Sequence, residues 1–225
     1  MDTADKLAEI FKEFPGIGER QARRFVYFLM ARNPAYVEGL AKLLSELKKE
    51  TRRCKECFRF FADNPRRSPA AKSVEICELC SDPNADPELL MVVEKDSDLE
   101  SIRKSGTYGG KYFVLGGLVP IVEKDTPKFV RIKELKERMS RKWEALPPTG
   151  GRQGLPRGNS LKEVILAFSL SPQGDHTDFY IRNELKESAE KFGIKISSLG
   201  RGLSTGTELE YSDNDTIKNA LKNRQ

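Results

Sequence analysis

The spacing of apolar residues divides the chain into a helical beginning and a longer region in which strands alternate with helices. Between Leu7 and Phe14, and again between Ala22 and Leu29, apolar residues recur every three or four positions, as in amphipathic helices. A third helix is expected to begin near Pro34 and to end in a basic run. The first fifty residues are therefore predicted to be all helical, around a core of leucine and phenylalanine.

The pattern changes after residue 84. The runs "LLMVVE", "KYFVL", "EVILAFS" and "IKISSL" predict strands, with helices in "SDLESIRKS", "RIKELKERMSRKWEA", "DHTDFYIRNELKESAEKF" and "NDTIKNALKNR". Ser97 and Glu100 have the spacing of a capping box for the first of these helices. This alternation predicts a mostly parallel sheet covered by helices, so the fold class is multidomain α+β. Residues 147–160, rich in proline and glycine, are expected to form an exposed loop that carries Arg152 and Arg157.

Composition narrows the class of protein only slightly. The 225 residues suffice for one large domain or for two or three small ones, and the net charge of +5 is compatible with nucleic acid. No apolar run approaches the roughly 20 residues of a membrane span, and no signal peptide is recognisable. We therefore expect a cytoplasmic protein with no membrane partner.

The stretch "FPGIGERQARR" breaks the helical beginning and then adds positive charge. Gly16 and Gly18 allow a tight turn between two helices, as in a helix-hairpin-helix motif, where backbone amides face a DNA phosphate. Arg20, Arg23 and Arg24 follow at the start of the second helix, where cations oppose the helix dipole. A polyanion would favour them, so we expect salt-sensitive DNA binding without sequence preference. The alternative is an ordinary helix turn with solvated arginines.

The four cysteines form two Cys-x-x-Cys pairs about 20 residues apart. The pairs are Cys54 with Cys57 and Cys77 with Cys80. Four thiolates at this spacing suit a tetrahedral structural Zn²⁺ with no position left for water. Free thiols and thioredoxin-like redox chemistry are the alternatives. The predicted zinc unit would stabilise a segment too short to hold its own core.

Taken in order, these features resemble the RecR family of bacterial recombination mediators. The resemblance runs through "FPGIGERQARRF", "CKECFRF…CELC", "SGTYGGKYFVLGGLVPI", "EVILAFSLSPQGDHTDFYI" and "LGRGLSTGTELEYSD". It implies a helix-hairpin-helix domain at 1–52, a four-cysteine zinc finger at 53–83, a Toprim domain at 84–194 and a C-terminal Walker-B-like segment and helix at 195–225. It also implies a dimer or ring-like tetramer that encircles single- and double-stranded DNA.

The resemblance also implies partners and site residues. Family members have no enzymatic activity of their own and act with RecO, in some cases with RecF, to help load RecA on single-stranded DNA. The two basic family positions that contact DNA correspond to Arg20 and Arg24. The acidic positions implicated in the contact with RecO correspond to Glu94 and Asp175. The family usually has an acid where this chain has Gln173, which places the strength of that contact in question.

Catalytic Toprim domains present an alternative function, a Mg²⁺-dependent nuclease. Their chemistry needs a Glu after the first strand and an Asp-x-Asp pair after a later one. Glu94 satisfies the first requirement, but Asp175 and Asp178 are three residues apart. We therefore expect no enzyme, and we expect His176, the only histidine, to be an exposed loop residue. A third reading is a zinc-stabilised scaffold that does not bind DNA.

Overall fold

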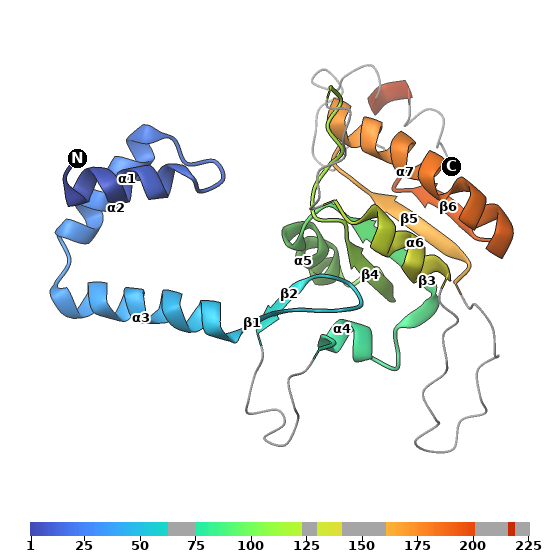
Figure 1. Cartoon of the computed structure of the whole chain (residues 1–225), viewed down its shortest axis with the longest axis horizontal. Helices are drawn as coiled ribbons and strands as arrows, with labels where there is room; N and C mark the ends of the chain where they lie inside the picture. The colour runs from blue at the N-terminus through green and yellow to red at the C-terminus, as the bar shows by residue number, and fades with distance from the viewer. Residues whose placement is uncertain (63–74, 123–129, 141–160, 201–215, 219–225) are drawn as a thin grey trace. The chain divides into compact units, whose positions relative to one another are not determined.

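The protein is described by a computed structural model that covers residues 1–62, 75–122, 130–140, 161–200 and 216–218 (Figure 1). The chain divides into two compact units. The helical unit contains Met1–Thr51 with Ala62–Ala70, and the sheet unit contains Arg52–Phe61 with Ala71–Gln225. The predicted loop at 147–160 with Arg152 and Arg157, and most of the predicted C-terminal segment and helix, lie outside the described residues.

The helical unit consists of three helices, as the apolar spacing predicted. They are α1 (Thr3–Lys12), α2 (Glu19–Met30) and α3 (Pro34–Glu50). Asp2 begins α1 by accepting a hydrogen bond from the Asp5 amide, and Asn33 begins α3 by accepting one from the Tyr36 amide. Each cap satisfies an amide that the first helical turn leaves without a partner.

The core of the helical unit is smaller than the sequence predicted. Only Ala8, Ala22 and Val26 are buried among its described residues, so the expected core of leucine and phenylalanine is wrong. Phe11 contacts Phe25 edge to face, with ring centroids 5.7 Å apart, where α1 and α2 meet. Small side chains at the helix contact let the two backbones approach, and most large apolar side chains stay at the surface.

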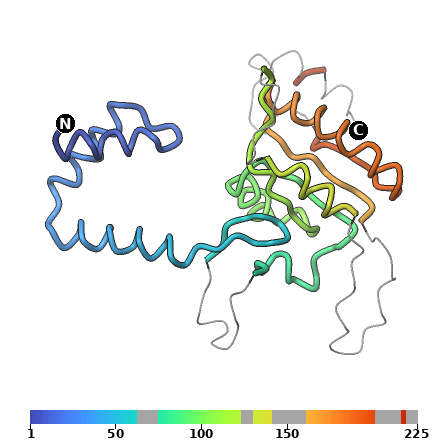
Figure 2. The backbone as a smooth tube through the Cα atoms, in the orientation of Figure 1, coloured from blue at the N-terminus to red at the C-terminus, as the bar shows by residue number. Residues whose placement is uncertain are grey.

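The cysteine segment forms a two-stranded hairpin and one short helix. Strands β1 (Thr51–Arg53) and β2 (Phe60–Ala62) pair, and the backbone turns back between them (Figure 2). Helix α4 (Glu78–Ser81) follows at the second cysteine pair. Neither pair opens a long helix among the described residues, which is the layout that a thioredoxin-like site requires.

A four-stranded sheet forms the centre of the sheet unit. Its strands lie in the order β4-β3-β5-β6, with all neighbours parallel, and are β3 (Asp86–Val93), β4 (Gly110–Val114), β5 (Glu163–Ala167) and β6 (Lys195–Ser198). This arrangement confirms the predicted parallel sheet. In β4 all five residues are buried, because helices cover both faces of the sheet.

Three helices cover the two faces. Alternate residues of the strands pack against α6 (Ile132–Ser140) and α7 (Pro172–Phe192) on one face, in a core that includes Phe113, Leu166 and Leu185. The opposite residues of the strands pack against Leu99 of α5 (Asp96–Ser105). No helix among the described residues is long and apolar enough to cross a bilayer.

Two local predictions are corrected. Helix α5 begins at Asp96, and the Asp98 carboxylate accepts the Lys95 amide at 3.3 Å, so the Ser97–Glu100 capping box is wrong. Its helix starts one residue earlier than the expected cap. Helix α7 was predicted to begin at Asp175, but it begins at Pro172, a residue whose fixed φ suits the first helical turn.

Candidate metal centre and nucleic-acid interface

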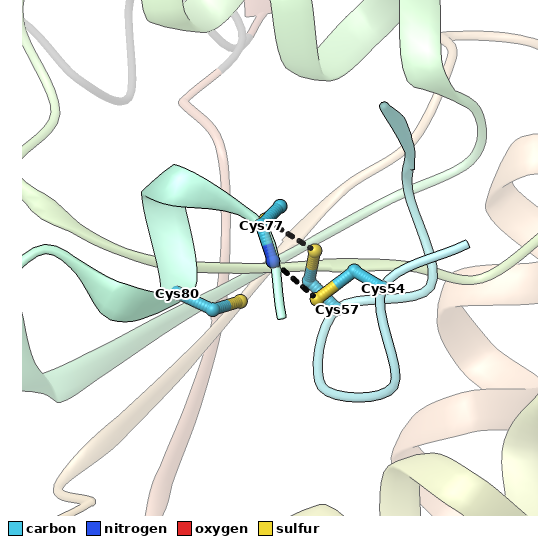
Figure 3. Close-up of side chains that lie close together, drawn as sticks. All are labelled: Cys54, Cys57, Cys77 and Cys80. Carbon is cyan, nitrogen blue, oxygen red and sulfur yellow. Dashed lines mark hydrogen bonds between the residues drawn. The ribbon is translucent and has the colours of Figure 1, made fainter. Parts of the chain in front are cut away.

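The four cysteines come together from two separate segments. Cys54 and Cys57 lie on the turn between β1 and β2, and they face Cys77 and Cys80 at the start and within α4 (Figure 3). All four sulfur atoms lie within 4.8 Å of one another, and the Cys57 and Cys77 sulfurs are 3.5 Å apart. Tetrahedral zinc with Zn–S bonds of about 2.3 Å places its sulfurs about 3.8 Å apart, so this spacing fits a tetrathiolate site.

Backbone amides already point at the cluster. The amides of Glu56 and Cys77 each donate to the sulfur of Cys54 at 3.4 Å. Such hydrogen bonds favour the ionised thiolate, which is the form that binds a metal. All four thiols are free, and the hydrogen bonds are consistent with sulfurs that serve as metal ligands.

Because the four thiols lie close together, their pKa values shift in opposite directions. Hydrogen bonding with Cys57 lowers the pKa of Cys54. Hydrogen bonding with Cys54, then with the other two thiols, and burial raise the pKa of Cys80. Without a cation, four adjacent thiolates repel one another, so they cannot all be ionised. A divalent ion removes that conflict, and the donor set of four buried sulfurs selects a thiophilic metal such as Zn²⁺.

The cysteine turn closes the outer edge of the sheet. The Val114 amide of the edge strand β4 donates to the Cys57 carbonyl at 2.8 Å. Phe58, held with φ at 62°, packs on Phe113 with ring centroids 5.4 Å apart, on the face that carries α6 and α7. Leu79 of α4 packs on the opposite face. The metal segment therefore covers an edge that would otherwise expose unpaired backbone groups.

Three buried cations lie next to this segment, and sequence reasoning missed all of them. Arg138 of α6 pairs with Glu56, which lies between the first two cysteines. Arg59 lies 3.4 Å from Glu78 and 3.6 Å from Glu100. Lys111 of β4 donates to backbone carbonyls of the α4 segment, and burial lowers the pKa of its ammonium. A lysine inside the otherwise apolar run "KYFVL" was the one available signal.

The glycine spacing predicted that both Gly16 and Gly18 are needed for a tight turn between α1 and α2. Only Gly16 has a backbone conformation that requires glycine. Gly16 has φ at +77°, a conformation that side-chain-bearing residues rarely adopt. Gly18 has an extended backbone as the N-cap of α2, which any residue could adopt. No side chain caps α2, and a Cβ on Gly18 would meet nothing within 4 Å. The first amides of α2 are therefore accessible to an outside acceptor.

The three arginines of α2 differ in their surroundings. Arg23 lies 3.5 Å from Glu19, one turn earlier on the helix. For Arg20 and Arg24 the described residues provide no ion-pair partner, and both side chains are exposed. Arg24 lines a surface cavity of about 450 Å³ beside Phe25 and Phe28. The exposed cations next to the open N-terminus are thus Arg20 and Arg24.

The acidic residues lie at the carboxyl edge of the sheet but do not form a metal site. Glu94 directly follows β3, and Asp175 lies in the first turn of α7, after the neighbouring parallel strand β5. Asp178 pairs with Arg182 at 2.5 Å. Within the described ranges, the four cysteines are the only group of three or more metal-binding side chains whose ligand atoms lie close together.

His176 does not lie in an exposed loop, so that expectation is wrong. It lies in the first turn of α7, is half-buried and faces Tyr180 with ring centroids 6.4 Å apart. The helix begins four residues before His176, because Ser171 caps it by accepting the Gly174 amide at 3.1 Å. The histidine therefore lies in a helix beside Tyr180, at the margin of the buried face of α7.

Known proteins and family descriptions resemble this chain over nearly its whole length. A Toprim domain matches residues 88–199, and the helix-hairpin-helix and C-terminal regions described for RecR match residues 4–48 and 202–225. The recombination protein RecR of Bacteroides thetaiotaomicron is 33% identical over 98% of this chain and 92% of its own length. RecR of Lactobacillus acidophilus is 32% identical over 97% and 94%, and that of Amoebophilus asiaticus 34% over 93% and 89%.

Proposed function

Since the chain belongs to the RecR family of recombination proteins, we propose that it is a DNA-binding mediator of recombinational DNA repair. It acts in the cytoplasm as a dimer or tetrameric ring on single- and double-stranded DNA. With a RecO-like partner, and a RecF-like one in some settings, it helps to load RecA on single-stranded DNA. The main support for this proposal is the N-terminus of α2, which has no side-chain cap. Beside it lie two exposed arginines that lack ion-pair partners among the described residues.

DNA binding is assigned to the hairpin and the start of α2. Gly16 turns the backbone, and Gly18 leaves the first amides of the helix without a side-chain cap. A phosphate oxygen at this position accepts from those amides, and Arg20 and Arg24 supply the compensating charge. Arg23 contributes less, because Glu19 already neutralises it. Every contact is to the DNA backbone, so affinity does not depend on base sequence.

The test is a titration of labelled single- and double-stranded DNA, followed by anisotropy at several salt concentrations with Mg²⁺ present. The Arg20→Ala plus Arg24→Ala variant should bind weakly, and its slope of log affinity against log salt on duplex DNA should fall by about 2. Lys6→Ala on α1 plus Lys42→Ala on α3 is the matched control, since it removes the same charge elsewhere in the helical unit. Equal losses in both variants would contradict a specific hairpin site.

Self-association is supported by α3. This helix of 17 residues has no buried residue, although Val37, Leu44 and Leu47 form a stripe at helical spacing. Leu44 and Leu47 are 59% and 61% exposed. An apolar stripe that no described residue buries, in a helix of this length, indicates a surface that binds another protein. A second copy of the chain is the partner that a ring requires.

The carboxyl edge of the sheet is the proposed contact for the RecO-like partner. Glu94 and Asp175 follow neighbouring parallel strands and so lie along one edge. Leu170 and Phe179, 71% and 66% exposed, belong to the same end of the unit. A mixed acidic and apolar surface suits a basic partner surface. Gln173 stands in the same first turn of α7 as an uncharged residue, so Gln173→Glu should strengthen binding to the partner and leave DNA binding unchanged.

The proposed role is not catalytic. A Mg²⁺-dependent nuclease needs several carboxylate oxygens around the ion, and Glu94, Asp175 and Asp178 do not form such a group within the described residues. The same titration, examined on a denaturing gel, tests this point. Intact strands support a mediator, whereas cleavage that Glu94→Gln abolishes would replace it by the nuclease. The bound metal is structural Zn²⁺ on Cys54, Cys57, Cys77 and Cys80.

A further inference from the structure

Lys111 is a buried lysine whose donors are all used. It lies in the buried strand β4 and is only 6% exposed. Its Nζ donates to the backbone carbonyls of Leu79, Cys80 and Asp82 at 3.4, 3.1 and 2.8 Å. An ammonium has three N–H donors, and here each has a carbonyl acceptor. The geometry therefore fits the charged form of the side chain.

Lys111 differs from the other two buried cations in its counter-charge. Arg138 pairs with Glu56, and Arg59 lies between two glutamates. Among the described residues, no carboxylate forms an ion pair with Lys111, whose three acceptors are neutral carbonyls. The charge of the Asp82 carboxylate acts on Lys111, but Asp82 is exposed and water screens its effect. A buried ammonium without a counter-ion is strongly unfavourable, so negative charge is expected close to it.

The cysteine cluster is the source of that charge. A Zn²⁺ ion with four thiolates carries a formal net charge of −2, because each bound thiol has lost its proton. The carbonyls that accept from Lys111 belong to the segment of α4 that holds Cys77 and Cys80. Cys80 thus offers its sulfur to the cluster and its carbonyl to Lys111. One short helix connects the ammonium to the metal ligands.

We propose that Lys111 is a positioning residue of the zinc centre. Its ammonium fixes the end of α4 and balances the negative charge of the zinc–tetrathiolate cluster. This inference rests on the proposed zinc site and extends it to a residue of β4. Zinc and Lys111 therefore stabilise each other, and removing the charge weakens zinc binding.

Three substitutions separate charge from hydrogen bonding. Lys111→Arg keeps the charge, Lys111→Gln keeps an N–H donor without charge, and Lys111→Met keeps neither. The dissociation constant for zinc and its release rate are measured on the full chain by competition with a chromogenic chelator. We expect zinc affinity to fall about 10- to 100-fold in the Gln and Met variants, as for other outer-shell partners of metal ligands. The Arg variant should stay within about threefold of the wild type. Lys186→Met, at an exposed lysine of α7, is the control for loss of one charge.

The zinc affinities and the folding of the variants decide whether the proposal holds. Equal zinc affinity in all Lys111 variants, or full retention in Lys111→Gln, would overturn it and leave only a carbonyl-capping role. An equal loss in Asp82→Asn would assign the charge balance to that carboxylate instead. Neutral variants that fold only in excess zinc support the proposal, and variants that fail at every zinc concentration overturn it. Zinc content of the wild-type chain is measured first, so that a failure of the metal assignment is distinguishable from a failure of this inference.

Discussion

The helical unit and the sheet unit place their large apolar residues in opposite environments. In the sheet unit Leu135, Leu166 and Leu185 are at most 1% exposed, in the core between the sheet and helices α6 and α7. In the helical unit Leu44 and Leu47 are 59% and 61% exposed, and the buried residues among those described are two alanines and one valine. Both units have apolar residues at helical spacing, but in the described parts of the chain only the sheet unit covers most of them.

The two units therefore differ in how much of their apolar surface they bury. The sheet unit has two covered faces, and its β4 edge is closed by the cysteine turn. The helical unit has its apolar stripe and its exposed arginines on the surface, where another copy and DNA are the proposed partners. Stability is thus concentrated in the sheet unit, and the proposed contacts with DNA and with a second copy lie in the helical unit.

Zinc removal is expected to have the largest effect, and it should act on the sheet unit alone. Chelation removes the ion that holds Cys54 and Cys57 to α4, with a loss of stability on the order of 5 kcal/mol or more. Hydrogen exchange should increase at the Val114 amide and in the cysteine turn and remain unchanged in α1 and α2. Unchanged protection at Val114 would show that the β4 edge does not depend on the metal.

A leucine in the core of the sheet unit gives the second largest effect. Leu166→Ala removes a side chain that is 1% exposed and packs among residues of α6 and α7. The free energy of unfolding should fall by about 2–5 kcal/mol, because the cavity does not collapse fully. Urea denaturation followed by circular dichroism measures it. A loss below about 1 kcal/mol would indicate a loosely packed sheet unit.

The matched change in the helical unit should affect assembly instead of folding. Leu44→Ala plus Leu47→Ala removes exposed side chains, so the free energy of unfolding of the dilute protein should change by no more than about 0.5 kcal/mol. Sedimentation equilibrium should show self-association at least about tenfold weaker, equivalent to about 1.4 kcal/mol. Lys42→Ala, on the opposite face of the same helix, serves as the control. Unchanged assembly would mean that α3 is not the interface.

The smallest effect on stability is expected at Gly18. Gly18→Ser gives α2 a side-chain cap and should raise stability by a few tenths of a kcal/mol. The serine hydroxyl then occupies an amide that the proposed phosphate contact needs, so DNA affinity should fall although no charge is lost. Thermal unfolding and anisotropy measure the two effects separately. If both stability and DNA affinity rise, phosphate binding by the α2 amides is wrong.

Much of the local structure could be predicted from spacing alone. The helices from Thr3 to Glu50 and the four parallel strands could be predicted because the spacing and length of apolar runs distinguish helices from strands. The cysteine cluster followed from two Cys-x-x-Cys pairs, because each pair forms a local turn. The helix cap at Asp98 was missed, as was the start of α7, because boundaries depend on single hydrogen bonds.

The sequence by itself determined the secondary elements, the metal ligands and the arginine-bearing hairpin, because each depends on residues that are neighbours along the chain. Only the tertiary structure decided which apolar stripes are buried and which cations adjoin the cysteines. Lys111 lies about 30 residues from Cys80, and Arg138 about 80 from Glu56, so no local pattern connects them. Their positions follow from strand order and helix packing. Burial then makes an unpaired charge costly, and this cost links the metal centre to the sheet.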